Sequence, residues 1–277
     1  QRQMCIRDRQ YSIILLGFGM NLFEILAVGS QSLLIIVSTI GTALITAYIL
    51  SRIMNIERDI ATLVGVGSSI CGGSAIAAAA PVIKASDKDI AQSISVIFLF
   101  NVVAAFLFPA LGDMLGFTDT GFGMWAGTAI NDTSSVVSAG QTWASAHGSD
   151  TALNYATIVK LTRTLAIIPI CLGLAYITSK TKNTAADVKI TSIFPMFILY
   201  FVIAAIFNTL AGESLPVLAQ LPSIGKFMIA MAMAAIGLNT NLVNLVKSGG
   251  KPILLGLVCW IFIALVSIGM QHVLGIW

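Results

Sequence analysis

The series of long apolar runs limits most strongly what this chain can fold into. About 20 consecutive apolar residues span the hydrocarbon core of a bilayer. Nine apolar segments follow one another here, at 11–29, 31–51, 60–84, 90–111, 122–144, 155–178, 192–211, 223–246 and 252–275. Only 10% of the 277 residues are charged, against about 25% in a soluble domain. The sequence therefore predicts an all-α membrane protein that crosses the bilayer several times.

The breaks between these segments are short and polar, so we expect residues 11–277 to form a single transmembrane domain. Residues 1–10, QRQMCIRDRQ, begin without Met and differ in composition from the rest. We expect this stretch to be a non-native or disordered start. We also expect the chain to be truncated at its N-terminus, with helices missing before residue 11.

Two internal matches indicate a repeat. The first pairs residues 17–34 with 237–254 at a constant offset of 220, and the second pairs 67–74 with 127–134 at an offset of 60. Seven segments separate the two copies of the first match, so we expect the copies to run in opposite directions across the membrane. Inverted repeats of this kind are common in secondary transporters.

Two polar stretches interrupt the apolar pattern, GVGSSICGGSAIAAAA at 65–80 and GMWAGTAINDTSSVVSAG at 123–140. Glycine costs about 1 kcal/mol in a helix, and Ser, Thr, Asn and Asp compete for backbone hydrogen bonds. We therefore predict two broken or re-entrant helices. The free N–H groups at the start of a half-helix form an anion site. Candidate substrate-binding residues are Ser68, Ser69, Gly72, Gly73, Ser74, Thr128, Asn131, Thr133 and Ser134. Close helix packing by small residues is the alternative interpretation.

The loop charges bear on how these two segments cross the membrane. If every segment spans once, Lys84 and Lys88 lie opposite the other loop cations. If 60–84 and 122–144 each enter and return, both lysines join the other cations, and Asp113 and Asp119 lie on the opposite face. The tendency of Lys and Arg to stay inside favours the second arrangement, with Lys/Arg-rich loops in the cytoplasm and the C-terminus outside. A discontinuous helix that crosses fully remains the alternative.

Three of the charged residues within the apolar segments are the main functional candidates. Asp132 costs at least about 2.5 kcal/mol to place in a membrane, which makes it a functional candidate, either as a proton carrier or as a Na⁺ ligand that couples transport. Lys160 and Arg163 are three residues apart, on one helical face. They are predicted to draw an anion towards the broken helices, or alternatively to extend to the lipid headgroups. Asn101 is interpreted as a hydrogen-bonding residue between helices.

Several motifs together resemble the YeiH-type family of sulfate exporters, from about residue 11 to the C-terminus. They are GSSICGGSAI, GTAINDTSSVVSAG, KLTRTLAIIP and AMAMAAIGLNTNL, in this order. The resemblance implies a multi-spanning protein of the bacterial inner membrane, similar to transporters with inverted repeats and broken helices. Its motifs cover Ser68, Ser69, Gly72, Gly73, Asn131, Asp132, Lys160 and Arg163. Sulfate is one candidate substrate among small oxyanions and sulfonates.

These observations predict a secondary transporter that binds a small anion at the membrane midplane, coupled to H⁺ or Na⁺. An anion channel and a carrier of another small organic anion are the alternatives. We do not expect an enzyme, because no HExxH, Ser–His or paired-Asp arrangement is present. No cofactor, metal site or nucleic-acid partner is indicated. The lipid bilayer is an expected partner, and a homo-oligomer remains open.

Overall fold

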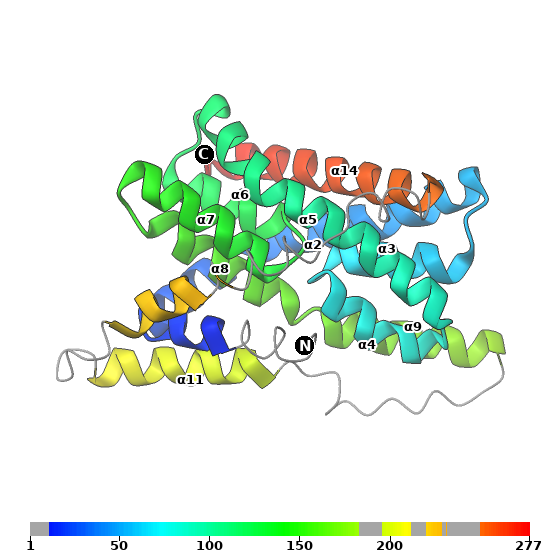
Figure 1. Ribbon diagram of the computed structural model, residues 1–277, viewed down its shortest axis with the longest axis horizontal. Helices are drawn as coiled ribbons and strands as arrows, with labels where there is room; N and C mark the ends of the chain where they lie inside the picture. Colours follow the sequence, from blue (N-terminus) through cyan, green and yellow to red (C-terminus); the bar gives the residue numbers. More distant parts are fainter. Residues whose placement is uncertain (1–10, 183–195, 212–219, 229–230, 232–249) are drawn as a thin grey trace.

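The computed structural model describes residues 11–182, 196–211, 220–228, 231 and 250–277, which are helical almost throughout (Figure 1). The elements are α2 (Leu22–Met54), α3 (Arg58–Ser69), α4 (Gly73–Ile83), α5 (Asp87–Leu115), α6 (Asp119–Ala129), α7 (Thr133–His147), α8 (Thr151–Thr164), α9 (Ile167–Lys182), α11 (Met196–Ala211) and α14 (Gly250–Leu274). In the described residues, 4 helical stretches are long and apolar enough to cross a membrane: Leu22–Met54, Asp87–Leu115, Thr151–Lys180 and Gly250–Leu274. The prediction of an all-α membrane protein is confirmed.

Helix α2 corrects one predicted boundary. We expected segments 11–29 and 31–51 to be separate, but α2 runs without a break for 33 residues. It begins one residue after Asn21, whose side chain accepts a hydrogen bond from the N–H of Phe23. Asparagine is a strong helix N-cap, whereas one glycine inside an apolar helix costs only about 1 kcal/mol. Gly29 is therefore tolerated within α2, where a Cβ would lie 3.3 Å from Thr162 Oγ1.

Contacts between the long helices define the two ends of the bundle. The Nζ of Lys251 donates to the carbonyl of Met54 at 3.0 Å, which places the start of α14 beside the end of α2. Gly256 packs against Val96, so α5 also begins near this end, which we call the Met54 end. At the opposite end, the hydroxyl of Thr118 donates to the carbonyl of Trp277 at 2.7 Å. We call this the Trp277 end.

Each of the two polar stretches forms a helical hairpin that enters and leaves the bundle at the same end (Figure 1). The hairpin α3–α4 begins just after α2 and finishes just before α5, and both of these junctions lie at the Met54 end. In the hairpin α6–α7, Trp143 Nε1 donates to Asp119 Oδ1 at 2.8 Å, which joins the end of α7 to the start of α6 at the Trp277 end. Within the described residues, both stretches thus turn back inside the bundle, as the re-entrant arrangement expects, and whether they re-enter a membrane stays a prediction.

The predicted count of nine segments and the predicted inverted repeat are not confirmed. In the match at an offset of 220, the first copy at 17–34 is described, but residues 237–249 of the second copy lie outside the described residues. The inverted repeat stays a prediction. Within the described part, Arg52, Arg58, Lys84, Lys88 and Lys251 belong to the Met54 end, which also carries the acids Glu57, Asp59, Asp87 and Asp89. The Trp277 end carries Asp113, Asp119 and Asp150, with Lys226 paired to Asp150, so the cations are concentrated at the Met54 end but the charges are not fully separated. Which end faces the cytoplasm also stays a prediction.

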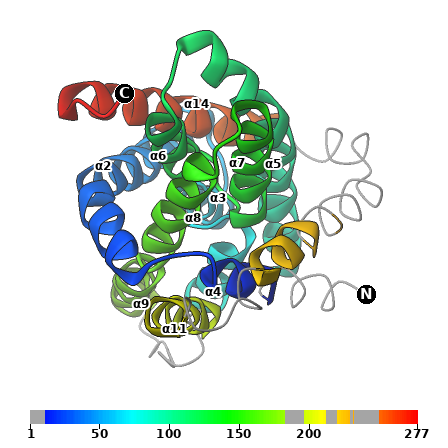
Figure 2. The same cartoon turned by 90° about the vertical axis from the view of Figure 1, so that its left-hand side faces the viewer.

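Helices α8 and α9 together make one bent span. The bend falls at Leu165 and Ala166, just before Pro169. Proline has no N–H to donate to the carbonyl four residues earlier, which here is that of Leu165, and its ring crowds that carbonyl. Figure 2 shows α8 near the centre of the bundle, with α2 and α5 on opposite sides. Residues on α8 are therefore placed to reach both hairpins.

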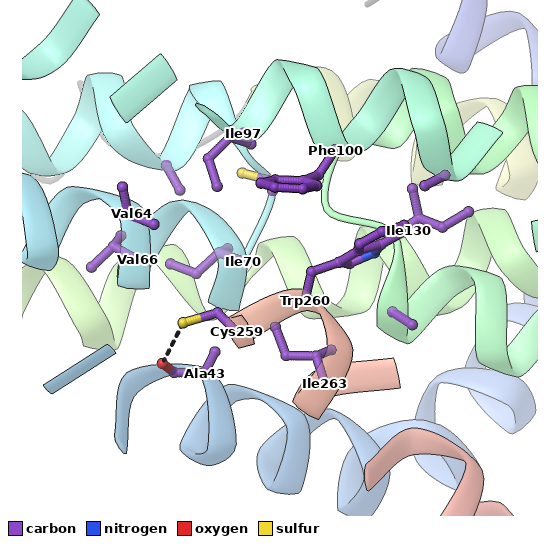
Figure 3. Close-up of a cluster of buried hydrophobic side chains, with 14 of the residues drawn as sticks. Ala43, Val64, Val66, Ile70, Ile97, Phe100, Ile130, Cys259, Trp260 and Ile263 are labelled. Atoms are coloured by element: carbon purple, nitrogen blue, oxygen red, sulfur yellow. Dashed lines mark hydrogen bonds between the residues drawn. The ribbon is translucent and has the colours of Figure 1, made fainter. Parts of the chain in front are cut away.

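The largest apolar cluster lies beside the ends of both hairpins. Ile70 follows α3 and Ile130 follows α6, and both are fully buried in one cluster with Phe100 and Trp260 (Figure 3). Trp260 and Phe100 pack with ring centroids 5.6 Å apart. The place where the hairpins turn is thus enclosed by protein, as a broken backbone inside a membrane requires.

Candidate functional site

The tips of the two hairpins meet inside the bundle. Residues 70–72 connect α3 to α4, and residues 130–132 connect α6 to α7. A Cβ placed on Gly72 would lie only 3.7 Å from the carbonyl oxygen of Asn131 and 3.3 Å from Ile97. Gly72 also has φ 70°, a backbone conformation that residues with a Cβ rarely adopt. The turn therefore favours glycine because of its positive φ, whereas a Cβ here would make only an ordinary contact with the other tip at Asn131.

Helix α8 supplies two buried cations to this meeting point. Lys160 and Arg163 are both 0% exposed. The ammonium of Lys160 donates to the carbonyls of Ile70 at 2.7 Å and Ile130 at 2.8 Å. Their burial rules out the alternative in which these side chains extend to the lipid headgroups.

Arg163 binds the last carbonyls of the same two half-helices. Its Nε donates to Ser69 O and its Nη2 to Ser68 O, each at 2.8 Å, and its Nη1 donates to Thr128 O. The last carbonyls of a helix have no partner within the helix and form its negative end, where a cation is favourable. Lys160 and Arg163 thus neutralise the C-terminal ends of α3 and α6. Their predicted role as direct anion ligands stays a prediction.

The N-terminal ends of the two returning half-helices differ. Asp132 is the N-cap of α7, and its Oδ2 accepts from the N–H of Ser134 at 3.1 Å and from the Ser134 hydroxyl. In α4 the N-cap is Gly72, which provides no side-chain hydrogen bond. A carboxylate therefore already lies at the positive end of α7, while the positive end of α4 has no such group.

The other predicted residues differ in whether their polar side-chain atoms are hydrogen-bonded and in how far they are exposed. The hydroxyl of Thr128 is bonded to Met124 O at 2.7 Å and lies 2.6 Å from Ser267 Oγ, and the hydroxyl of Ser69 donates to Val66 O. These hydroxyls serve the helices and their packing. By contrast, Ser68 Oγ and Asn131 Oδ1 are buried and have no hydrogen-bond partner among the described residues. Thr133 is 7% exposed, Gly73 is half-buried and Ser74 is exposed.

The interpretation of Asn101 as a residue that hydrogen-bonds a neighbouring helix is confirmed. Asn101 of α5 is 2% exposed, and its Oδ1 accepts from the N–H of Asp132 at 3.1 Å. Its Nδ2 lies 3.5 Å from the position of a Cβ on Gly72 and has no partner among the described residues. A single Asn in the middle of an otherwise apolar span was the signal available. The described residues contain no cluster of three His, Cys, Asp or Glu side chains that suits a metal.

Together, the fold and this site define a helical membrane protein with two helical hairpins whose tips meet inside the bundle. The chain belongs to the family described as conserved hypothetical protein 698, whose model matches residues 9–256. This membership is consistent with the YeiH-type resemblance.

Named relatives support the same assignment. The chain is 57% identical over 276 residues to a UPF0324 membrane protein of Streptococcus mutans, covering 97% of this chain and 81% of the relative. It is 55% identical over 282 residues to a UPF0324 membrane protein of Fusobacterium nucleatum, covering 96% of this chain and 82% of the relative. No solved structure matches the chain.

Proposed function

We propose that this protein is a secondary transporter that carries a small anion across the cell membrane. The supporting observation is that two re-entrant hairpins from opposite ends of the bundle meet at Gly72 and Asn131. Interrupted helices at membrane depth are a common way to build transporter sites, because their ends present free backbone groups to a substrate. The half-helices α4 and α7 both begin at this meeting point.

The local charge favours an anion as substrate. Arg163 and Lys160 lie fully buried behind the tips, and the first turn of α4 adds the positive end of a helix. Small oxyanions, including sulfate, and sulfonates fit this chemistry. Asp132 lies at the other tip and is the group that couples transport to H⁺ or Na⁺. The end with the basic loops, the Met54 end, faces the cytoplasm under this proposal.

The test is flux measured in proteoliposomes that contain the purified protein. Radiolabelled sulfate and a radiolabelled sulfonate are supplied under a pH gradient, under a Na⁺ gradient and with neither. The proposal expects saturable uptake, stimulation by one of the two gradients, and counterflow against unlabelled anion. Flux that rises linearly with concentration and lacks counterflow identifies a channel instead. Folded protein with no anion flux above that of empty liposomes overturns the proposal.

A further inference from the structure

We infer that the transported anion binds at the first turn of α4, with the side-chain amide of Asn101 as its second donor. This inference rests on the proposed function and specifies which of the two tips holds the substrate. The α7 tip is excluded from this role because Asp132 already caps it.

The orientation of Asn101 is fixed by its neighbour. The N–H of Asp132 donates to Asn101 at 3.1 Å, and only the oxygen of the amide can accept this bond. The amide nitrogen therefore points to the other side, where it lies 3.5 Å from the position of a Cβ on Gly72. This nitrogen is buried and unpartnered in the described part of the chain. A buried donor without a partner is rare and calls for a ligand or another explanation.

The backbone beside this amide suits a negatively charged ligand. Gly72 caps α4 and Gly73 is its first residue, so two successive positions lack a Cβ that would keep a ligand from the N–H groups. The first N–H groups of a helix have no intrahelical partner and form its positive end.

In α4 the buried thiol of Cys71 already accepts from the N–H of Ala75, so the N–H groups offered to a ligand are those of Gly73 and Ser74. Helix α4 is 11 residues long, and the side chain of Ser74 in its first turn is exposed. Asn101 is therefore buried on one side of this turn, and Ser74 in the same turn is exposed.

This geometry selects a ligand with at least two acceptor oxygens on one centre. One oxygen accepts from the N–H groups of the α4 turn, and another accepts from Asn101 Nδ2. Sulfate and alkyl sulfonates have this form, whereas halide ions lack the separate acceptors. Asn101 then has two roles: its oxygen accepts from the N–H of Asp132, and its nitrogen selects an oxyanion over a halide ion.

The variant Asn101→Asp separates the two roles of this side chain. It keeps an oxygen for the N–H of Asp132 and replaces the donor NH₂ by an acceptor. Binding of sulfate and of methanesulfonate to the purified protein is measured by calorimetry, at constant chloride. We expect affinity to fall about tenfold or more, because a hydrogen bond to a charged ligand is lost and a like charge is introduced. The matched control is Ser93→Ala, which removes a buried, unpartnered hydroxyl about two turns earlier on α5 and is expected to bind both anions as the wild type does.

A second variant tests the backbone part of the site. Gly73→Pro removes one N–H at the first position of α4, where proline is compatible with a helix. A Cβ at this position meets only ordinary contacts, the nearest at 3.5 Å. We expect a similar loss of affinity, and this variant decides the question if Asn101→Asp does not fold. If folded Gly73→Pro and Asn101→Asp both bind the anions with wild-type affinity, the inferred site is wrong and the proposed function still stands. If the wild-type protein binds neither anion, the proposed function itself is wrong.

Discussion

The carbonyl oxygens of Ile70 and Ile130, which are 60 positions apart in the sequence, accept hydrogen bonds from the same ammonium group, that of Lys160. Each of these residues is the first after a half-helix, α3 or α6. Ser68 and Thr128 are related by the same offset, and the carbonyls of both accept hydrogen bonds from Arg163. The match at an offset of 60 therefore relates positions that are held in the same way by α8.

Replacing Arg163 tests whether its main role is structural. Arg163→Ala leaves the carbonyls of Ser68, Ser69 and Thr128 without their hydrogen-bond donor. Each buried carbonyl that is left unpaired reduces the stability by about 1–3 kcal/mol. We expect a marked fall in melting temperature in detergent, with a smaller fall for Arg163→Lys, which keeps the charge but not the planar fork. A folded Arg163→Ala protein with wild-type melting and weakened anion binding would instead make Arg163 a direct ligand.

Replacing Gly127 tests the packing of α6 on α8. A Cβ at Gly127 would lie 2.8 Å from the carbonyl of Ala156 and 2.8 Å from Val159, and Gly123 one turn earlier is equally close to Tyr155 and Ala152. Gly127→Ala is expected to destabilise the protein by about 1–3 kcal/mol because the two helices must move apart. The control is Gly41→Ala on α2, where a Cβ has nothing within 4 Å and helix propensity favours alanine. Equal melting temperatures for both variants would contradict this account of the contact.

Substitutions at Asp132 separate its cap from its charge. Asn is as good an N-cap as Asp, so Asp132→Asn is expected to keep the melting temperature close to that of the wild type. Asp132→Ala loses the cap and is expected to cost about 0.5–2 kcal/mol. In proteoliposomes, both variants are expected to lose stimulation by the ion gradient. Gradient-stimulated flux at the wild-type rate in Asp132→Asn would remove Asp132 from the coupling step.

The re-entrant arrangement predicts which loop residues share a side of the membrane. Single cysteines placed at Arg58, Lys84 and Asp119 can be labelled from each side with a thiol reagent that does not cross the bilayer, after the native cysteines have been replaced. Cysteines at Arg58 and Lys84 are expected to react from one side, and a cysteine at Asp119 from the other. Labelling of the first two from opposite sides would indicate that segment 60–84 crosses the membrane fully.

The sequence predicted the positions of both interruptions because they depend on local composition. Glycine and small polar residues in GSSICGGS and GTAINDTSS weaken the helix at those points, and the turns at 70–72 and 130–132 lie within them. The role of Lys160 and Arg163 was not predictable in this way. Whether a buried cation binds a ligand or the end of a helix depends on which elements lie around it, and those elements are about 30 to 95 residues away in the chain.

Asn101 shows a second limit of the sequence. A lone Asn in an apolar span indicates that a hydrogen bond is needed, but not which of its two polar atoms is occupied. Only the contact with the N–H of Asp132 distinguishes the oxygen from the nitrogen. The expected break between residues 29 and 31 was a wrong prediction. The local helix-weakening effect of Gly29 is too small to interrupt the long apolar helix α2.

The five bonds from Lys160 and Arg163 also constrain how the molecule can change shape. Pulling one tip away from the other would strand carbonyls and a guanidinium in a medium of low polarity, which is costly. Under the proposed transport function, the two tips and α8 are therefore expected to move as a single block, together with Asn101 of α5, which accepts from the N–H of Asp132. Under the same proposal, the substrate would be exposed to alternate sides of the membrane by movement of this block, including Asn101, against the remaining helices.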